Sequence, residues 1–196
     1  MCDRISRISH YLEQHESEPR DSAVVYRIVK KEQALTLTQE GIVLPNYSEN
    51  KDKRGETAQR VEEIFNDVIK EKLRTDDPRI SRMKCIYAFP RDPSSENSMG
   101  LPFNQDEDER VTFQVDAARA LVCDGECFTE AYIALDRYGD EERAREWAER
   151  YWDSAMVLSD YLGVHTGDED DHDDFSFPEV LVFQPVAPED MQKKVL

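Results

Sequence analysis

Glu179, Arg27 and Tyr87 are the residues of this sequence whose types and positions suit chemistry, because each lies in a run of apolar residues. Glu179 follows a proline in the run 175–183, which is mostly β-branched, aromatic or aliphatic. Burying a glutamate is costly unless it has a partner or a task. Arg27 interrupts a second such run. A carboxylate can offset a growing positive charge, and an arginine can bind an anion through two parallel hydrogen bonds.

The runs that carry these residues predict strands. Residues 23–29 and 83–89 are rich in Val, Ile, Ala and aromatic residues, and the second run stops at a proline. Short apolar runs with many β-branched or aromatic residues are typical of buried strands. We therefore expect strands at 23–29, 83–89 and 175–183, each with one candidate residue.

Helices are predicted where apolar residues recur every three or four positions. The clearest patterns span 57–74 and 141–162, and a shorter one at 3–15 opens the chain. A fourth helix is predicted at 31–40, because Gly41 follows where a left-handed C-terminal cap is expected. The two long amphipathic helices have the apolar stripe needed to cover a sheet.

The middle of the chain predicts one further strand and a hairpin. Residues 111–115 alternate apolar and polar side chains, which is typical of a half-exposed strand. Residues 120–123 and 127–133 flank an Asp-Gly-Glu turn, which favours two antiparallel strands. The polar segments 46–55 and 91–109 are predicted to be loops.

These elements indicate an α+β fold in a chain of 196 residues, a length suited to one well-covered core. We expect residues 1–22 to form an N-terminal helix and loop, and residues 23–196 to form a single α+β domain.

The charge composition is strongly acidic, with 43 Asp and Glu residues against 25 Lys and Arg residues and a net charge of −18. Such a surface keeps a protein hydrated in a salt-rich environment, or it imitates nucleic acid and occupies a basic DNA-binding partner. The same charge disfavours unassisted binding to a phosphate backbone.

Neither the cysteines nor the acidic stretch predicts a metal site. The cysteines at 2, 85, 123 and 127 lack a second Cys/His pair at ligand spacing, so we expect free thiols. The acidic run 168–174 lacks the pattern of an EF-hand and is predicted to be a solvated loop. The sequence shows neither a signal peptide nor a membrane span, and we expect a cytoplasmic protein without a membrane partner.

The order of the predicted elements resembles the ADP-ribosyltransferase superfamily. The segments 25–27, 86–89 and 178–182 are similar to its three motifs, which carry His or Arg, then Ser/Thr or Tyr, then Glu. The segment 33–44 and the end of the chain look most like RNA 2'-phosphotransferases and DNA-modifying ADP-ribosyltransferase toxins. The resemblance covers about residues 23 to 192.

This resemblance implies split β-sheets with covering helices and an NAD-dependent transfer of ADP-ribose to an unknown protein or nucleic-acid acceptor. It implies that Glu179 is catalytic and that Arg27, Tyr87 and Tyr26 bind NAD. Cleavage of the nicotinamide–ribose bond passes through an oxocarbenium-like state, which a carboxylate near the ribose would stabilise. Arg27 would bind the pyrophosphate or the adenosine ribose, and Tyr87 would stack on the nicotinamide ring.

Three alternatives remain open. A buried ion pair between Arg27 and Glu179 would merely link two strands, with Tyr87 as part of the core. The net charge favours a second alternative, a non-enzymatic acidic interaction protein such as a DNA mimic or an inhibitor of a basic partner. A third possibility is phosphotransfer from a 2'-phosphorylated RNA.

Overall fold

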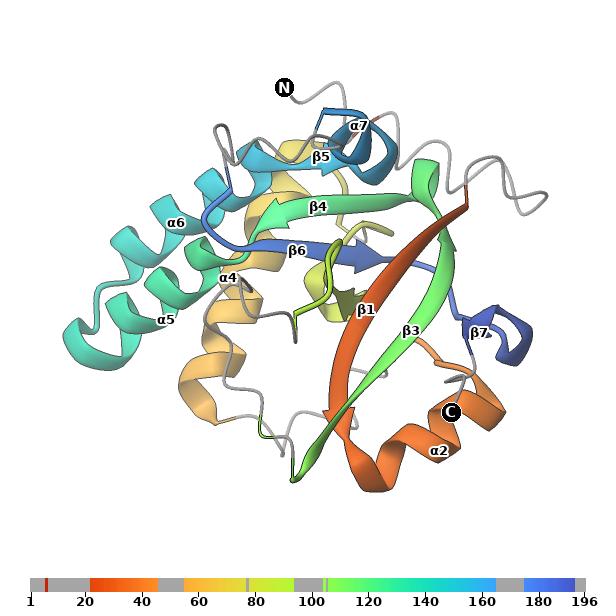
Figure 1. Ribbon diagram of the computed structural model, residues 1–196. Helices are drawn as coiled ribbons and strands as arrows, with labels where there is room; N and C mark the ends of the chain where they lie inside the picture. Colours follow the sequence, from red (N-terminus) through yellow and green to blue (C-terminus); the bar gives the residue numbers. More distant parts are fainter. Residues whose placement is uncertain are drawn as a thin grey trace.

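Two antiparallel sheets form the centre of the fold, and helices flank them (Figure 1). The computed structural model describes residues 6, 22–45, 55–76, 78–93, 104, 106–164 and 175–192. The first sheet has the strand order β1-β3-β7, and the second has the order β2-β6-β4-β5. The strands are β1 (Ser22–Lys30), β2 (Ile86–Ala88), β3 (Asp108–Asp116), β4 (Ala120–Asp124), β5 (Met156–Val157), β6 (Pro178–Val182) and β7 (Met191–Gln192).

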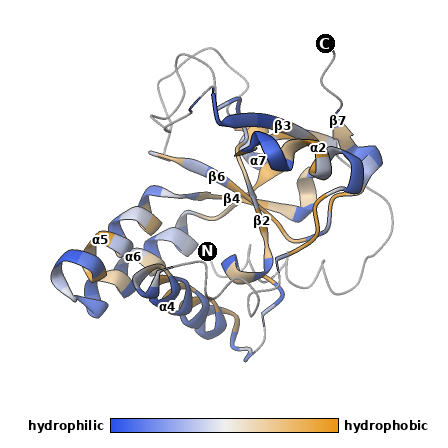
Figure 2. Ribbon diagram, turned by 90° about the horizontal axis from the view of Figure 1, so that it is seen from below, coloured by the Kyte–Doolittle hydropathy of each residue, from blue (hydrophilic) through white to orange (hydrophobic). Residues whose placement is uncertain are grey.

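The helices group mainly on one side of the second sheet. They are α2 (Lys31–Glu40), α4 (Glu56–Leu73), α5 (Glu126–Tyr138), α6 (Glu141–Ser154) and α7 (Leu158–Val164), with 3-10 turns η2 (Arg82–Lys84), η3 (Ala117–Arg119) and η5 (Pro188–Asp190). Helices α4, α5 and α6 pack against one another (Figure 2). Helix α2 lies apart from them, against β1 and β3.

The second sheet is buried on both faces, which explains why its strands are continuous apolar runs. Leu181 on β6 lies opposite Leu121 on β4 and Tyr87 on β2, so the three side chains share one face. That face packs against helices α4, α5 and α6. Val180 and Val122 point the other way and pack against the first sheet.

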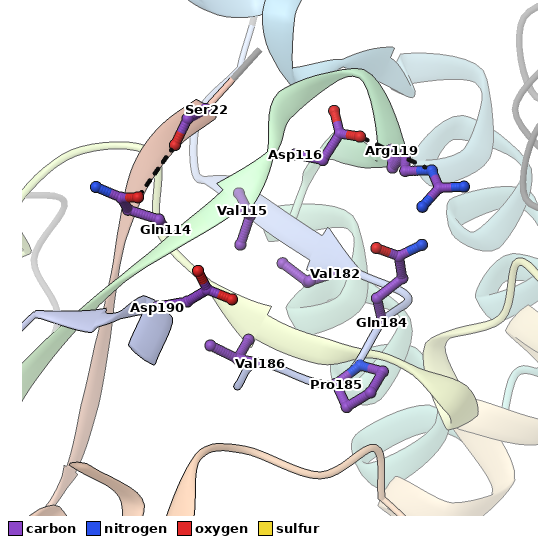
Figure 3. A pocket seen from close by; sticks show the side chains of 10 residues that line it. All are labelled: Ser22, Gln114, Val115, Asp116, Arg119, Val182, Gln184, Pro185, Val186 and Asp190. Atoms are coloured by element: carbon purple, nitrogen blue, oxygen red, sulfur yellow. Dashed lines mark hydrogen bonds and ion pairs between the residues drawn. The ribbon is translucent and has the colours of Figure 1, made fainter. Parts of the chain in front are cut away.

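Besides this packing, one residue pair in the described part of the chain joins the two sheets by backbone hydrogen bonds. Tyr26 on β1 and Phe89, just beyond β2, exchange two backbone hydrogen bonds with N–O distances of 2.9 and 2.7 Å. This bridge brings the strand that carries Arg27 next to the strand that carries Tyr87. A cavity of about 320 Å³ lies at the other end of β6, beside Val182 (Figure 3).

Gly41 ends α2 in a backbone conformation that requires glycine. Its φ is 80° and its amide donates to the carbonyl of Leu37. A Cβ atom at this position would lie 2.2 Å from the carbonyl oxygen of Val186. The glycine therefore lets the chain pair Ile42 with Val186 immediately after the helix.

The predicted strand at 127–133 is wrong, because these residues belong to α5. Asp124 accepts a hydrogen bond from the amide of Glu126 at 3.1 Å, which starts the helix where a hairpin turn was expected. Cys127, Ala131 and Ala134 are the buried residues, and their spacing of four and three is helical.

The predicted helix at 141–162 is broken. It stops at Ser154, and the short strand β5 pairs with β4 through Val157 opposite Leu121. Helix α7 then begins at Leu158. The predicted strand at 83–89 is also shorter, because the turn η2 takes its first residues.

The remaining described elements follow the sequence closely. Strand β1, helix α2 and helix α4 occupy the predicted ranges 23–29, 31–40 and 57–74 within two residues. Strand β3 contains the predicted range 111–115, and the mixed helix-and-sheet class is confirmed. The predicted helix at 3–15, apart from Ser6, most of the loop at 46–55 and the acidic run at 168–174 lie outside the described residues.

Candidate functional site

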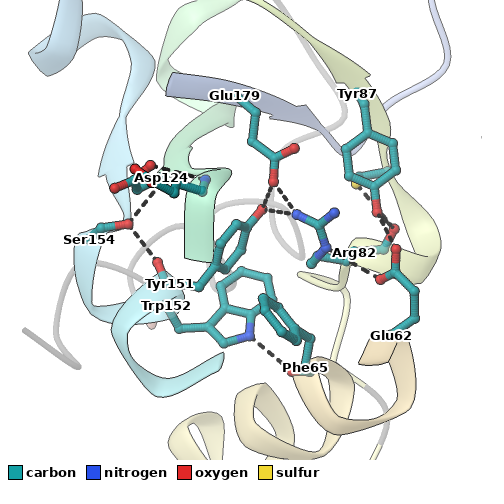
Figure 4. Close-up of polar contacts among 11 residues, drawn as sticks. Glu62, Phe65, Arg82, Tyr87, Asp124, Tyr151, Trp152, Ser154 and Glu179 are labelled. Carbon is teal, nitrogen blue, oxygen red and sulfur yellow. Dashed lines mark hydrogen bonds and ion pairs between the residues drawn. The ribbon is translucent and has the colours of Figure 1, made fainter. Parts of the chain in front are cut away.

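Glu179 lies in the buried layer between the second sheet and the helices. It is the second residue of β6 and lies opposite Cys123 on β4, so its side chain points toward the helices. Only 8% of the residue is exposed. Its carboxylate forms an ion pair with Arg82 and accepts a hydrogen bond from the hydroxyl of Tyr151 (Figure 4).

Arg82 is the centre of this cluster. The residue belongs to η2 and is 4% exposed, and its guanidinium also forms an ion pair with Glu62 on α4, with Nε 3.3 Å from Oε2. Four aromatic rings surround the guanidinium at centroid distances of 4.2 to 5.5 Å; they belong to Phe65, Tyr87, Phe128 and Tyr151. Cations are attracted to aromatic faces, so the pocket around Arg82 stabilises its charge in two ways.

Tyr87 reaches the same cluster from β2. Its hydroxyl donates to the carbonyl oxygen of Arg82 at 2.6 Å and lies 3.3 Å from Oε1 of Glu62. The residue as a whole is partly exposed. The phenol oxygen is therefore held inside the cluster by its contacts with Arg82 and Glu62.

Arg27 lies on β1, close to Tyr87 but outside the Arg82 cluster. Burial lowers the pKa of Arg27, while Cys85 and Tyr87 raise it by electrostatic attraction. Within the described ranges, Arg27 forms no ion pair or hydrogen bond with a carboxylate. It is a largely buried cation that lacks an acidic partner in this part of the chain.

Tyr26 points to the other side of β1, as successive residues of a strand do. The guanidinium of Arg110 lies 5.9 Å from the centroid of its ring. Tyr26 therefore contributes to the site through its backbone pairing with Phe89, and its ring faces away from Arg27.

Burial keeps the phenols of the cluster neutral and leaves its guanidinium charged. Burial lowers the pKa of Arg82, but the carboxylates and phenols around it raise that pKa well above its ordinary value. Burial raises the pKa of Tyr87 and of Tyr151 well above the usual range. Arg82 thus stays charged, and two carboxylates surround this single cation.

The buried thiols are equally inert. Burial raises the pKa values of Cys85 and Cys123, and it raises that of Cys127 to about 12. A thiolate is the form that attacks electrophiles or binds metals, so these three cysteines serve as core residues. The described residues hold no group of three or more His, Cys, Asp or Glu arranged around a possible metal ion.

The structure brings two of the predicted site residues to a common partner. Glu179 and Tyr87 both contact Arg82, while Arg27 lies on the neighbouring sheet. Glu179 does form the buried ion pair that the alternative interpretation expected, but with Arg82 in place of Arg27.

Sequence reasoning missed Arg82, Tyr151 and Glu62. Glu62 could have been recognised from the sequence, because it lies on the apolar stripe of α4, three positions before Phe65. In the structure it is 2% exposed. Tyr151 looked like any other core aromatic of its helix. Arg82 follows a polar segment and had no local signal.

Comparison with known protein families, with curated proteins and with solved structures finds no significant match to this chain. Among the described residues, no helix is both long and apolar enough to cross a membrane.

Proposed function

We propose that this protein is an NAD-dependent ADP-ribosyltransferase with an ADP-ribosyltransferase-like arrangement of its two sheets. The observation that carries the proposal is Arg27. A largely buried cation without a counter-charge among the described residues is costly, and it is unusual in a chain with a net charge of −18. A bound pyrophosphate would supply the missing anion, since guanidinium groups bind phosphate oxygens through paired hydrogen bonds.

The neighbouring residues supply the other parts of such a site. Tyr87 is partly exposed and lies near Arg27, and in the proposed site its ring stacks on the nicotinamide ring. Glu62 and Glu179 together carry one more negative charge than Arg82 compensates. That excess favours a cation, and the nicotinamide ring of NAD is cationic.

Glu179 would act as a fixed carboxylate. Arg82 and Tyr151 orient it, so it needs little reorganisation when positive charge develops on the ribose. The side chain of Glu179 is 10% exposed, against 5% for Arg82. The proposal therefore implies that NAD approaches from the Glu179 side and that Arg82 yields one contact with Glu179 when the ribose binds.

The direct test is release of nicotinamide from NAD by the purified full chain, with and without protein and nucleic-acid acceptors. We expect Glu179→Gln to reduce the rate by a factor of at least about one hundred, as loss of a transition-state contact does. Glu189→Gln, at an exposed position of η5, is the matched control and should not change the rate of nicotinamide release. Absence of NAD binding and of nicotinamide release with every acceptor would refute the proposal.

The second candidate is a non-enzymatic acidic interaction protein. It is favoured by the ion pair with Arg82, which by itself explains why Glu179 is buried. In that case a basic DNA-binding protein should bind the chain, and its affinity should fall steeply with salt. Binding of this kind would be the same in wild type and in Glu179→Gln.

A further inference from the structure

The cavity beside Val182 is separate from the cluster around Glu179, because it lies at the opposite end of β6 (Figure 3). Its volume of about 320 Å³ is at the lower end of the range for small-molecule sites. Val115, Val182 and Val186 form its apolar wall. These three apolar side chains can pack against the face of a planar ring.

Two buried charged residues form the polar wall. Asp116 ends β3, and Arg119 ends η3; the side chain of each is 6% exposed. Nε of Arg119 lies 3.8 Å from Oδ2 of Asp116, a distance that allows attraction but no direct hydrogen bond. The opposite charges of Asp116 and Arg119 balance, and Asp190 adds a carboxylate to the lining, so the cavity suits an uncharged ligand better than an anion.

One carboxylate oxygen of Asp116 accepts a hydrogen bond within the protein, and the other does not. Its Oδ1 accepts the amide hydrogen of Ala118 at 3.0 Å and thereby caps η3. Its Oδ2 is buried and accepts no hydrogen bond from the described residues. Buried carboxylate oxygens in proteins almost always accept a hydrogen bond. A carboxylate oxygen that faces a cavity without one is therefore a suitable acceptor for an N–H or O–H group of a ligand.

Asp116 requires a hydrogen-bond donor on the ligand, and the adjacent Arg119 requires an acceptor. A guanidinium has five N–H donors, so Arg119 can keep its contact with Asp116 and still donate to a ligand oxygen. The side-chain amide of Gln184 points toward this pair (Figure 3). The wall therefore matches an N–H donor beside a carbonyl acceptor on a flat apolar ring.

We propose that this cavity binds a nucleobase through its ring-amide edge, with the ring N–H donating to Oδ2 of Asp116 and the adjacent carbonyl accepting from Arg119. The valine wall packs against the face of the base. This site does not depend on the NAD site, because none of the residues that line it belongs to the Arg82 cluster.

The test is a titration of the full chain with uridine and inosine, followed by isothermal calorimetry and by NMR. Their N-methylated forms, 3-methyluridine and 1-methylinosine, are the controls, since each lacks the ring N–H and keeps the carbonyl. We expect at least one parent nucleoside to bind at millimolar concentration or below, and its methylated form to bind at least about tenfold more weakly. The amide signals of Ala118 and Val115 should shift on binding.

Two variants locate the interaction. Asp116→Asn leaves a single acceptor oxygen, which the amide of Ala118 occupies, so nucleoside affinity should fall at least about tenfold. Gln184→Trp fills the cavity from a half-buried position and should abolish binding without altering the cap of η3. Equal binding of parent and methylated nucleosides, or no binding of either parent, which would mean that the cavity holds only water, overturns the proposal.

Discussion

Arg82 and Glu179 form an ion pair inside the layer between the second sheet and helix α4, where both residues are less than 10% exposed. The pair joins η2 to β6, and Glu62 extends it to α4. Three segments that are distant in the sequence thus depend on one guanidinium. The contact is therefore important for stability whatever chemistry Glu179 performs.

Removing Arg82 should destabilise the protein strongly. Arg82→Met keeps a similar volume but leaves Glu62 and Glu179 buried without their cation, so we expect the free energy of unfolding to fall by about 3–5 kcal/mol. Urea denaturation at neutral pH measures this change. Arg145→Met is the control, because Arg145 pairs with Glu71 and Glu149 at an exposed position and should contribute no more than about 1 kcal/mol. Equal effects of the two variants would contradict the importance of the buried pair.

Removing Arg27 should have the opposite effect on stability. Arg27 is largely buried and has no carboxylate partner in the described residues, so Arg27→Met removes a desolvated charge. We expect stability to stay equal or to rise, while NAD affinity falls by at least about tenfold, which is about 1.4 kcal/mol. Thermal unfolding and NAD titration measure the two effects separately. Loss of stability without loss of NAD binding would show that Arg27 is a structural residue.

The buried cysteines should resist alkylation. Because burial raises the pKa values of Cys85, Cys123 and Cys127, little thiolate is present near pH 8. We expect a Cys2→Ser variant to react with iodoacetamide much more slowly when folded than in urea. Raising the pH from 8 to 10 should increase the slow labelling of the folded protein about tenfold per pH unit without a plateau, since the pH stays below the raised pKa values, whereas ordinary thiols in urea level off above about pH 9. Rapid labelling of the native protein at pH 8 would contradict this prediction.

Gly41 should tolerate no side chain. Gly41→Ala places a Cβ atom against the carbonyl of Val186 and forces alanine into a region of positive φ, so we expect a loss of about 1–3 kcal/mol. Gly55→Ala, where the φ is −54° and a Cβ atom meets nothing within 4 Å, is the control and should not lower stability. Chemical denaturation compares the two variants. A loss of stability as large in Gly55→Ala as in Gly41→Ala would rule out this explanation.

The sequence predicted elements well where one face of a segment is buried and the other is exposed. In α4, Val61, Phe65 and Val68 repeat at helical spacing, so the helix was evident. The prediction failed at Cys127 because a run of seven mostly apolar residues suits a strand or a helix equally well. It failed at Ala155 because pairing of Val157 with β4 overrides the helical pattern.

The candidate site was predictable only in part, for a related reason. Glu179 stood out because a charge inside an apolar strand is locally visible. Arg82 became important only through contacts with Glu62 and Glu179, which are 20 and 97 positions away in the sequence. When a residue becomes important only through tertiary contacts, the residue pattern of its own segment does not reveal it.

The bridge between Tyr26 and Phe89 joins the two sheets by backbone hydrogen bonds at the edge of their shared core. Because these residues exchange both hydrogen bonds of the bridge, its opening frees both amides at once. Amide hydrogens exchange with solvent only while their hydrogen bonds are open. The exchange rates of the Tyr26 and Phe89 amides therefore report how often this bridge opens, and a ligand that spans Arg27 and Tyr87 would slow both together.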